Sequence, residues 1–177
     1  MLIDKDIYFV HIPRTGGRYV HRLLSENNYT VTVGFNNFFK QKEIAHLSYP
    51  DYEIYLNFMR CVKFTIVRNP LDKFISAISN DIAKNERTLE KILSNQESLN
   101  NHLNNMIFND SSNWYTPQIN FLNKEVKIYR FENSLGPVFN KWLTDNLNLK
   151  ITKEYHDKYD YSEKLFSLTE KQKEYVK

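Results

Sequence analysis

The chain has 177 residues, one cysteine and a formal net charge of +3 at pH 7. This length predicts a single domain, 1–177, with its own core, and one cysteine excludes an internal disulfide framework or a Cys-rich zinc module. The small charge argues against a nucleic-acid partner but allows a local site for an anionic ligand. The sequence shows no signal peptide and no apolar run of transmembrane length, so we expect a soluble, cytoplasmic protein without a membrane partner.

Patterns typical of strands and helices alternate along the chain. Short runs rich in β-branched and aromatic residues indicate strands, and apolar residues three or four apart indicate helices. In chain order, we expect a strand at 7–12, a helix at 19–26, a strand at 29–33, an irregular segment at 34–50, a helix at 52–60, a strand at 61–67, a helix from Pro70, a helix at 88–106, a strand at 127–131, a helix at 132–147 and a helix from Thr169. This alternation predicts an α/β layered fold with a largely parallel sheet.

The first motif, His11–Arg18, joins the first predicted strand to the first predicted helix. Its two adjacent glycines allow a tight turn close to a ligand, and the helix start offers free backbone N–H groups. Arg14, Thr15 and Arg18 add donors, so the segment suits a phosphate or a sulfate. The nucleotide pattern Gly-x-x-x-x-Gly-Lys-Ser/Thr and the dinucleotide pattern Gly-x-Gly-x-x-Gly are both absent. An ordinary turn between a strand and a helix remains the alternative.

The second motif, Phe64–Ala77, begins in the strongest predicted strand. Arg68 ends that strand, and ligands of open α/β sheets lie at the carboxyl ends of strands. Ser76 follows on the predicted helix, so we expect its hydroxyl near the Arg68 guanidinium. An arginine and a hydroxyl together form a good receptor for a phosphate monoester. The alternative is that Arg68 pairs with Asp72 and that Ser76 only packs.

Together, the two motifs resemble those of the sulfotransferases that use 3′-phosphoadenosine 5′-phosphosulfate (PAPS), and most of all the carbohydrate branch with the heparan sulfate and chondroitin enzymes. His11–Gly17 is similar to that family's His-x-Pro-Lys-Thr-Gly-Gly loop, which binds the 5′-phosphosulfate. Arg68–Ala77 is similar to its Arg-(Asn/Asp)-Pro-x-x-Arg/Lys-x-x-Ser-Ala motif, which binds the 3′-phosphate. Weaker similarities are Trp114–Gln118 to a Trp-x-Pro-Gln segment and Tyr129–Glu132 to an Arg-Phe-Glu strand end.

The resemblance implies the sulfotransferase fold, a three-layer α/β sandwich with a mainly parallel central sheet and a P-loop-like turn for the phosphosulfate. It implies PAPS as the sulfuryl donor, adenosine 3′,5′-bisphosphate as the product, a carbohydrate or other hydroxyl-bearing acceptor, and no metal. The residues that it implies for donor binding are Arg14, Thr15, Gly16, Gly17, Arg18, Tyr19, Arg68 and Ser76.

The sequence departs from the family pattern in its first loop. Arg14 stands where the family usually has lysine, and arginine keeps the charge but does not readily donate a proton. Arg18 and Tyr19 stand where a threonine or serine usually follows the second glycine. Arg14 is nevertheless our candidate for stabilising charge at the bridging oxygen, with Arg18 assisting. Family members often continue further than this chain, so we expect a reduced C-terminal wall of the acceptor site.

An alcohol acceptor has a high pKa, so a general base assists the transfer. His46 lies in the irregular segment 34–50, and several carbohydrate sulfotransferases carry their base histidine in a comparable place. We therefore predict His46 as the base, with Glu43 as the second choice and a histidine without a catalytic role as the alternative. Trp114 and Gln118 are weaker candidates for contacts with the acceptor.

Other functions remain open at this point. The acceptor could be a tyrosine side chain, a small alcohol or a phenol. The chain could also be a nucleotide-binding or carbohydrate-binding module that kept the fold and lost transfer, which Arg14 and Arg18 make a serious alternative. A kinase-like enzyme is disfavoured because the Lys-Ser/Thr pair of a nucleotide P-loop is missing.

Overall fold

The computed structural model of the chain describes residues 1–57, 59–83, 97–98, 100–101 and 113–155. The helix expected from Thr169 lies outside the described residues, and so does most of the helix expected at 88–106. In the described parts of the chain, no helix is long and apolar enough to cross a membrane.

Five strands form the central sheet, in the order β3-β1-β2-β6-β7. Their bounds are Leu2–Ile3 for β1, Ile7–Phe9 for β2, Val31–Thr32 for β3, Val62–Val67 for β6 and Lys127–Arg130 for β7. Strand β6 is parallel to both β2 and β7, whereas β1 is antiparallel to both β2 and β3. The sheet is therefore mixed but mostly parallel, and the predicted α/β class is confirmed.

Strand β1 was not predicted, and it makes the sheet mixed. It turns into β2 through Asp4 and Lys5, which have φ values of 45° and 70°. Three residues separate the paired Ile3 and Ile7, and the Asp6 N–H donates to the Ile3 carbonyl oxygen at 3.2 Å. Positive φ at both central positions is typical of a type I′ turn. A strand of two residues is too short to produce an alternating pattern, so the sequence gives no periodic signal for it.

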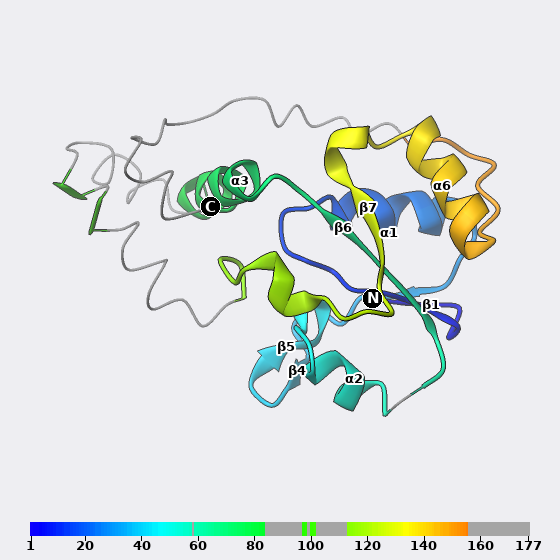
Figure 1. Cartoon of the computed structure of the whole chain (residues 1–177), viewed down its shortest axis with the longest axis horizontal. Helices are drawn as coiled ribbons and strands as arrows, with labels where there is room; N and C mark the ends of the chain where they lie inside the picture. Colours follow the sequence, from blue (N-terminus) through cyan, green and yellow to red (C-terminus); the bar gives the residue numbers. More distant parts are fainter. Residues whose placement is uncertain (58, 84–96, 99, 102–112, 156–177) are drawn as a thin grey trace.

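Side chains alternate across β2 and build a core on each face of the sheet. Phe9 packs against Phe64 of β6, with ring centroids 4.8 Å apart, on the face covered by α1 (Gly17–Glu26) and α6 (Pro137–Leu147). Tyr8 belongs to the cluster on the other face, with Tyr52 of α2 (Asp51–Tyr55). Figure 1 shows α1 and α6 on one side of the strands and α2 on the other, an arrangement compatible with three layers.

Two predicted helices are shorter than expected. The helix expected at 52–60 ends at Tyr55, because the chain turns at Asn57, which has a φ of 47°. The helix expected at 132–147 begins only at Pro137, since proline favours the first helical turn. The segment before it contains the 3₁₀ helix η3, Phe131–Asn133.

The segment expected to be irregular, 34–50, contains short regular elements. Strands β4 (Phe38–Phe39) and β5 (Lys42–Glu43) form a separate antiparallel hairpin. The 3₁₀ helix η1 (Ile44–His46) follows directly and carries the predicted base. Such short elements leave no clear period in a sequence, which is why they were not predicted.

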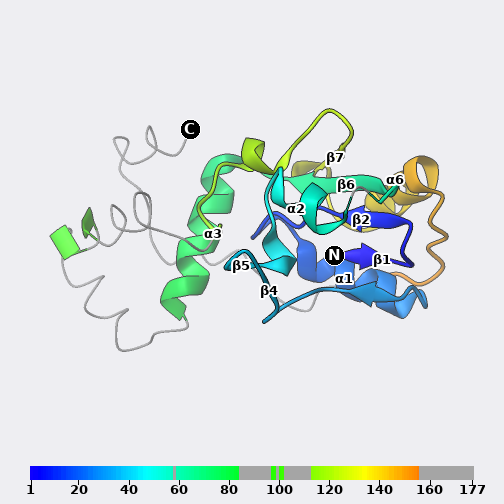
Figure 2. The same cartoon turned by 90° about the horizontal axis from the view of Figure 1, so that it is seen from below.

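The order of the strands brings the two sequence motifs together. Strands β2 and β6 are neighbours and run in the same direction, so the loops after them leave the same edge of the sheet. The first loop leads into α1, and the second leads into α3, Pro70–Ala83, as predicted from Pro70. Figures 1 and 2 show α3 extending beyond the end of β6. The 3₁₀ helix η2, Gln118–Phe121, precedes β7 in the chain.

Candidate functional site

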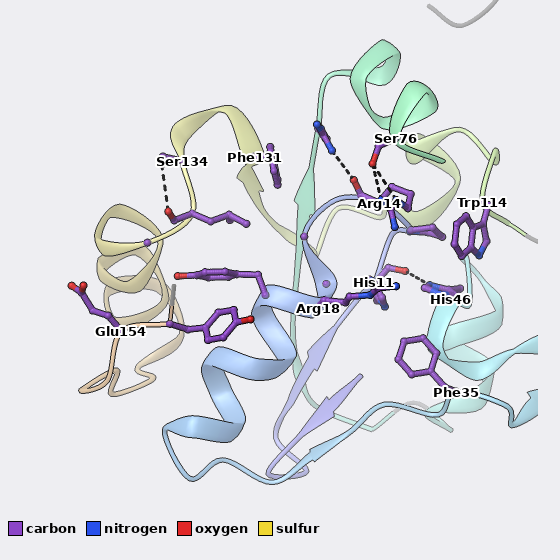
Figure 3. A pocket seen from close by; sticks show the side chains of 18 of the residues that line it. His11, Arg14, Arg18, Phe35, His46, Ser76, Trp114, Phe131, Ser134 and Glu154 are labelled. Atoms are coloured by element: carbon purple, nitrogen blue, oxygen red, sulfur yellow. Dashed lines mark hydrogen bonds between the residues drawn. The ribbon is translucent and has the colours of Figure 1, made fainter. Parts of the chain in front are cut away.

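A cavity of about 670 Å³ lies at the carboxyl ends of β2 and β6. The predicted residues that line it are His46, Arg14, Gly16, Gly17, Arg18, Tyr19, Arg68, Ser76 and Trp114. Thr15, Glu43 and Gln118 are not among the lining residues. Figure 3 shows Phe35, His46 and Trp114 at one end of the cavity, with Ser134 and Glu154 at the other.

The glycine turn before α1 is closely packed on its inner side. A Cβ atom at Gly17 would lie only 1.9 Å from Nε2 of His11. Gly16 has a φ of 100°, a conformation that other residues rarely adopt. The turn therefore requires both glycines, and it delivers the chain to the start of α1, whose first backbone N–H groups have no partner within the helix.

Thr15 serves this turn from the inside. Its side chain is fully buried, and its hydroxyl donates a hydrogen bond of 2.8 Å to the carbonyl oxygen of Ile12. The predicted contact of Thr15 with a phosphate therefore has no support in this geometry. A short hydroxyl side chain next to a glycine is typical of both roles, so the sequence alone did not separate them.

Arg14 crosses from the turn to α3 and does not point along the turn. Its Nε and Nη2 donate to the Ser76 hydroxyl oxygen at 3.1 and 3.0 Å, and its Nη1 donates to Oδ1 of Asn80 at 3.0 Å. Its guanidinium carbon also lies 5.9 Å from the centre of the Trp114 ring. The arginine that contacts Ser76 is thus Arg14, where the sequence led us to expect Arg68.

Arg68 lies beside Arg14 at the same end of the cavity. Its Nη1 donates to the Arg14 carbonyl oxygen at 3.4 Å, and its guanidinium carbon lies 4.5 Å from the centre of the Phe131 ring. Its Nε is buried without a hydrogen-bond partner in the described structure. Burial lowers the pKa of Arg68, and the carboxylates of Asp72 and Glu132 act against this shift. Arg68 also lines the cavity, so its positive charge favours an anion there.

The backbone of Arg68 is fixed by a side chain. Oε1 of Gln118 accepts from the Arg68 N–H at 2.9 Å, and Nε2 of Gln118 donates to the Arg68 carbonyl oxygen at 2.7 Å. The next residue, Asn69, donates its backbone N–H to the Glu132 carboxylate. Gln118 therefore supports Arg68, and its predicted contact with an acceptor has no support from this position.

Two histidines lie in the part of the cavity wall next to Phe35. His11 and His46 are 6% and 5% exposed, and their ring centroids lie 4.4 Å apart. Nδ1 of His46 lies 3.2 Å from the His11 carbonyl oxygen. A carbonyl only accepts, so Nδ1 carries the proton and Nε2 keeps its lone pair. Phe35 packs beside both imidazoles.

Burial lowers the pKa of both histidines. His46 is shifted first by burial, against the opposing effects of its bond to His11 and of Glu43. His11 is shifted well below its usual pKa by burial and by the neighbouring His46. Oε2 of Glu43 lies 3.7 Å from Nε2 of His46, so a proton taken up by His46 would be stabilised by this carboxylate. The arrangement suits His46 as a neutral proton acceptor at pH 7.

The sequence analysis missed two residues of the site. Asn80 holds Arg14, and its position four residues after Ser76 on α3 was a usable signal, since residues four apart share a helix face. Phe35 lies beside the histidines although its segment showed no periodic pattern.

The described residues contain no group of three or more His, Cys, Asp or Glu side chains that could hold a metal ion.

Comparisons of the chain with family models, with curated proteins and with solved structures find no match.

Proposed function

We propose that the protein is a sulfotransferase that moves a sulfuryl group from PAPS to an acceptor hydroxyl, with a carbohydrate as the acceptor class. One observation carries the proposal: two motifs separated by 45 residues of chain meet in one cavity that also contains His46. The loop before α1 lies there beside Arg68 and Ser76. The cavity volume of about 670 Å³ lies within the ordinary range for small-molecule sites.

The residues of the cavity fit a donor with two anionic ends. The first backbone N–H groups of α1 and the exposed side chain of Arg18 suit the phosphosulfate end. Arg68, which lines the cavity together with Ser76, suits the 3′-phosphate end. PAPS supplies a sulfuryl group bonded to a phosphate oxygen that is a good leaving group.

Transfer of this group requires an attacking oxygen, a proton acceptor and stabilisation of charge on the leaving oxygen. The acceptor oxygen forms a bond to sulfur while the bond between sulfur and the 5′-phosphate oxygen breaks. In this proposal Nε2 of His46 takes the acceptor's proton, and Glu43 stabilises the resulting imidazolium. Backbone N–H groups at the start of α1 and Arg18 stabilise the leaving oxygen. The sequence predicted that Arg14 stabilises charge at the bridging oxygen. Its guanidinium is bonded to Ser76 and Asn80 of α3 and not to the turn, so this role stays a prediction.

The second candidate is a nucleotide-binding module without transfer activity. The engagement of Arg14 with Ser76 and Asn80 favours it, because a loop cation held at α3 is less available to a leaving oxygen. Both candidates predict binding of the nucleotide, and only the first predicts turnover.

Calorimetric titration is the first test. Adenosine 3′,5′-bisphosphate, AMP and Mg-ATP are titrated into the wild type, Arg68→Ala and Arg130→Ala, whose arginine is exposed at the end of β7. We expect selective binding of the bisphosphate, weakened about 100-fold by Arg68→Ala and unchanged by Arg130→Ala, because a half-buried guanidinium in the cavity makes strong charge-assisted bonds to phosphate. Equal binding of all three nucleotides, or none, would contradict the proposal.

Turnover is the second test. Wild-type protein is incubated with PAPS and a panel of sugars, phenols and tyrosine peptides, and release of adenosine 3′,5′-bisphosphate is measured. Release that depends on a sugar hydroxyl supports the proposal. Tight binding without turnover on any acceptor would favour the binding module, and release that depends only on phenols or tyrosine peptides would replace the carbohydrate acceptor class.

A further inference from the structure

Asn80 lies behind the arginines of the cavity and is not one of its lining residues. It is one helical turn beyond Ser76 on α3, so the two side chains share a face of the helix. Oδ1 of Asn80 accepts from Nη1 of Arg14 at 3.0 Å, while the Ser76 oxygen accepts from the other two nitrogens. These three bonds fix both the position and the plane of the guanidinium.

The partners in these bonds are neutral oxygens, a hydroxyl and an amide. They orient the Arg14 guanidinium without neutralising its charge, unlike the carboxylate of an ordinary ion pair. An acceptor facing Arg14 also dictates the orientation of the Asn80 amide, and its Nδ2 is left buried without a hydrogen-bond partner in the described structure. A buried donor without a hydrogen-bond partner lowers the free energy of unfolding, so the Asn80 amide makes the folded protein less stable at this position.

The same geometry places two arginines in one part of the cavity wall. Nη1 of Arg68 donates to the carbonyl oxygen of Arg14, and both arginines line the cavity next to Ser76. An anion in this part of the cavity would be attracted by both positive side chains. The Ser76 hydroxyl accepts from Arg14 and keeps its own hydrogen to donate. Arg14, Arg68 and Ser76 therefore line the same cavity and can offer donors to one anion.

We propose that Asn80 is a specificity-determining positioning residue, which holds Arg14 so that the loop arginine joins Arg68 and Ser76 in binding the 3′-phosphate of the donor nucleotide. This inference rests on the proposed use of PAPS. Arg14 then strengthens the preference for a nucleoside 3′,5′-bisphosphate over a 5′-monophosphate. Asn80 itself contributes through Arg14 and does not touch the ligand.

The test measures discrimination, defined as the dissociation constant of AMP divided by that of adenosine 3′,5′-bisphosphate. Asn80→Ala removes the hydrogen bond that orients the charged Arg14 guanidinium. We expect this ratio to fall about tenfold, while the dissociation constant of AMP changes less than about twofold. The matched control is Ser79→Ala on the same helix, whose buried hydroxyl has no partner in the described structure. Thermal unfolding establishes that each variant is folded.

Two further variants separate positioning from a general structural effect. Asn80→Asp keeps an acceptor for Arg14 but neutralises its charge, so we expect at least the same loss of discrimination. Arg14→Ala is expected to lower the ratio too, and Asn80→Ala added to it should cause no further loss, since one residue acts through the other. Independent, additive losses would overturn the inference.

The outcomes separate this inference from the proposed function. A wild type that does not discriminate between the two nucleotides overturns both. A wild type that discriminates, with Asn80→Ala and Asn80→Asp variants that discriminate equally well, overturns the role of Asn80 alone and leaves the proposed function intact.

Discussion

Two parts of the cavity wall, named here the arginine end and the histidine end, are built from different kinds of side chain. The arginine end, which consists of Arg14, Arg68 and Ser76, gathers permanent positive charge and holds it with neutral oxygens. The histidine end, which consists of His11, His46 and Phe35, gathers buried imidazoles whose pKa is lowered by burial. The first end is suited to binding an anion and the second to moving a proton. A site with both ends can therefore be tested by changes that affect one end and spare the other.

The largest effect is expected from a change confined to the histidine end. His46→Ala should lower kcat about 100-fold to 10,000-fold, the usual contribution of a general base. Binding of adenosine 3′,5′-bisphosphate should stay unchanged, because the arginine end is intact. Steady-state rates at saturating acceptor, with calorimetry on the same samples, check both statements. The control is His21→Ala on α1, and full transfer activity in His46→Ala would end the assignment of the base.

A change at Gly17, which lies next to His11 in the turn that carries Arg14, should affect both the histidine end and the arginine end. Gly17→Ala places a Cβ atom against Nε2 of His11 and disturbs the turn that carries Arg14. We expect a loss of about 1–3 kcal/mol in the free energy of unfolding, as for other overpacked sites, together with weaker nucleotide binding. Denaturant unfolding measures the first effect and calorimetry the second. Gly136→Ala is the control, since no atom lies within 4 Å of a Cβ there, although its φ of 128° is itself unfavourable.

Thr15→Val should sharpen the comparison by affecting neither end. It removes the hydroxyl that donates to the Ile12 carbonyl oxygen while keeping the shape of the side chain. We expect a loss of about 1 kcal/mol in the free energy of unfolding and little change in nucleotide affinity. Thr15→Ser, which keeps the hydroxyl, is the matched variant. A large loss of affinity in Thr15→Val alone would mean that the hydroxyl contacts the nucleotide after all.

The smallest expected effect is the change of the transfer rate with pH near neutrality. Burial holds the pKa of His46 below its usual value, so the imidazole is already neutral at pH 7. The rate should change less than about twofold between pH 7 and 8.5 and should fall only as the pH drops below about 6.5. In that same acidic range His11 and His46 are protonated in the unfolded chain but stay neutral in the folded protein. The free energy of unfolding should therefore fall together with the rate as the pH drops. A rate that keeps rising up to pH 8.5 would contradict this assignment.

Elements with a strong and continuous pattern were predicted well from the sequence. Strand β6 and helix α3 occur where the sequence places them, because a buried apolar run and a proline at a helix start are local signals. The hairpin of β4 and β5 was missed because two-residue strands have no period. The extent of the helix at 52–60 was wrong because a positive φ at Asn57 is not visible in apolar spacing.

Within the site, the sequence predicted which residues gather but not which ones contact each other. Nine of its candidates line one cavity, because the order of β2 and β6 brings both motifs to one edge. The sequence did not predict the contact of Ser76 with Arg14, since the reach of a long side chain depends on its backbone, and Arg14 has a φ of 67°. Thr15 and Gln118 support the site from outside the cavity, a distinction that only three-dimensional contacts reveal.

The bond pair between Gln118 and the backbone of Arg68 has a consequence for the kinetics of recognition. A neighbouring strand would satisfy that N–H and C=O in the same way, so Gln118 in effect extends the ladder by one residue beyond β6. The conformational entropy of this residue's main chain is then lost during folding and not at the moment of binding. Loss of the Gln118 side-chain amide should therefore shorten the lifetime of the complex between the protein and its anionic ligand, although Gln118 does not line the cavity.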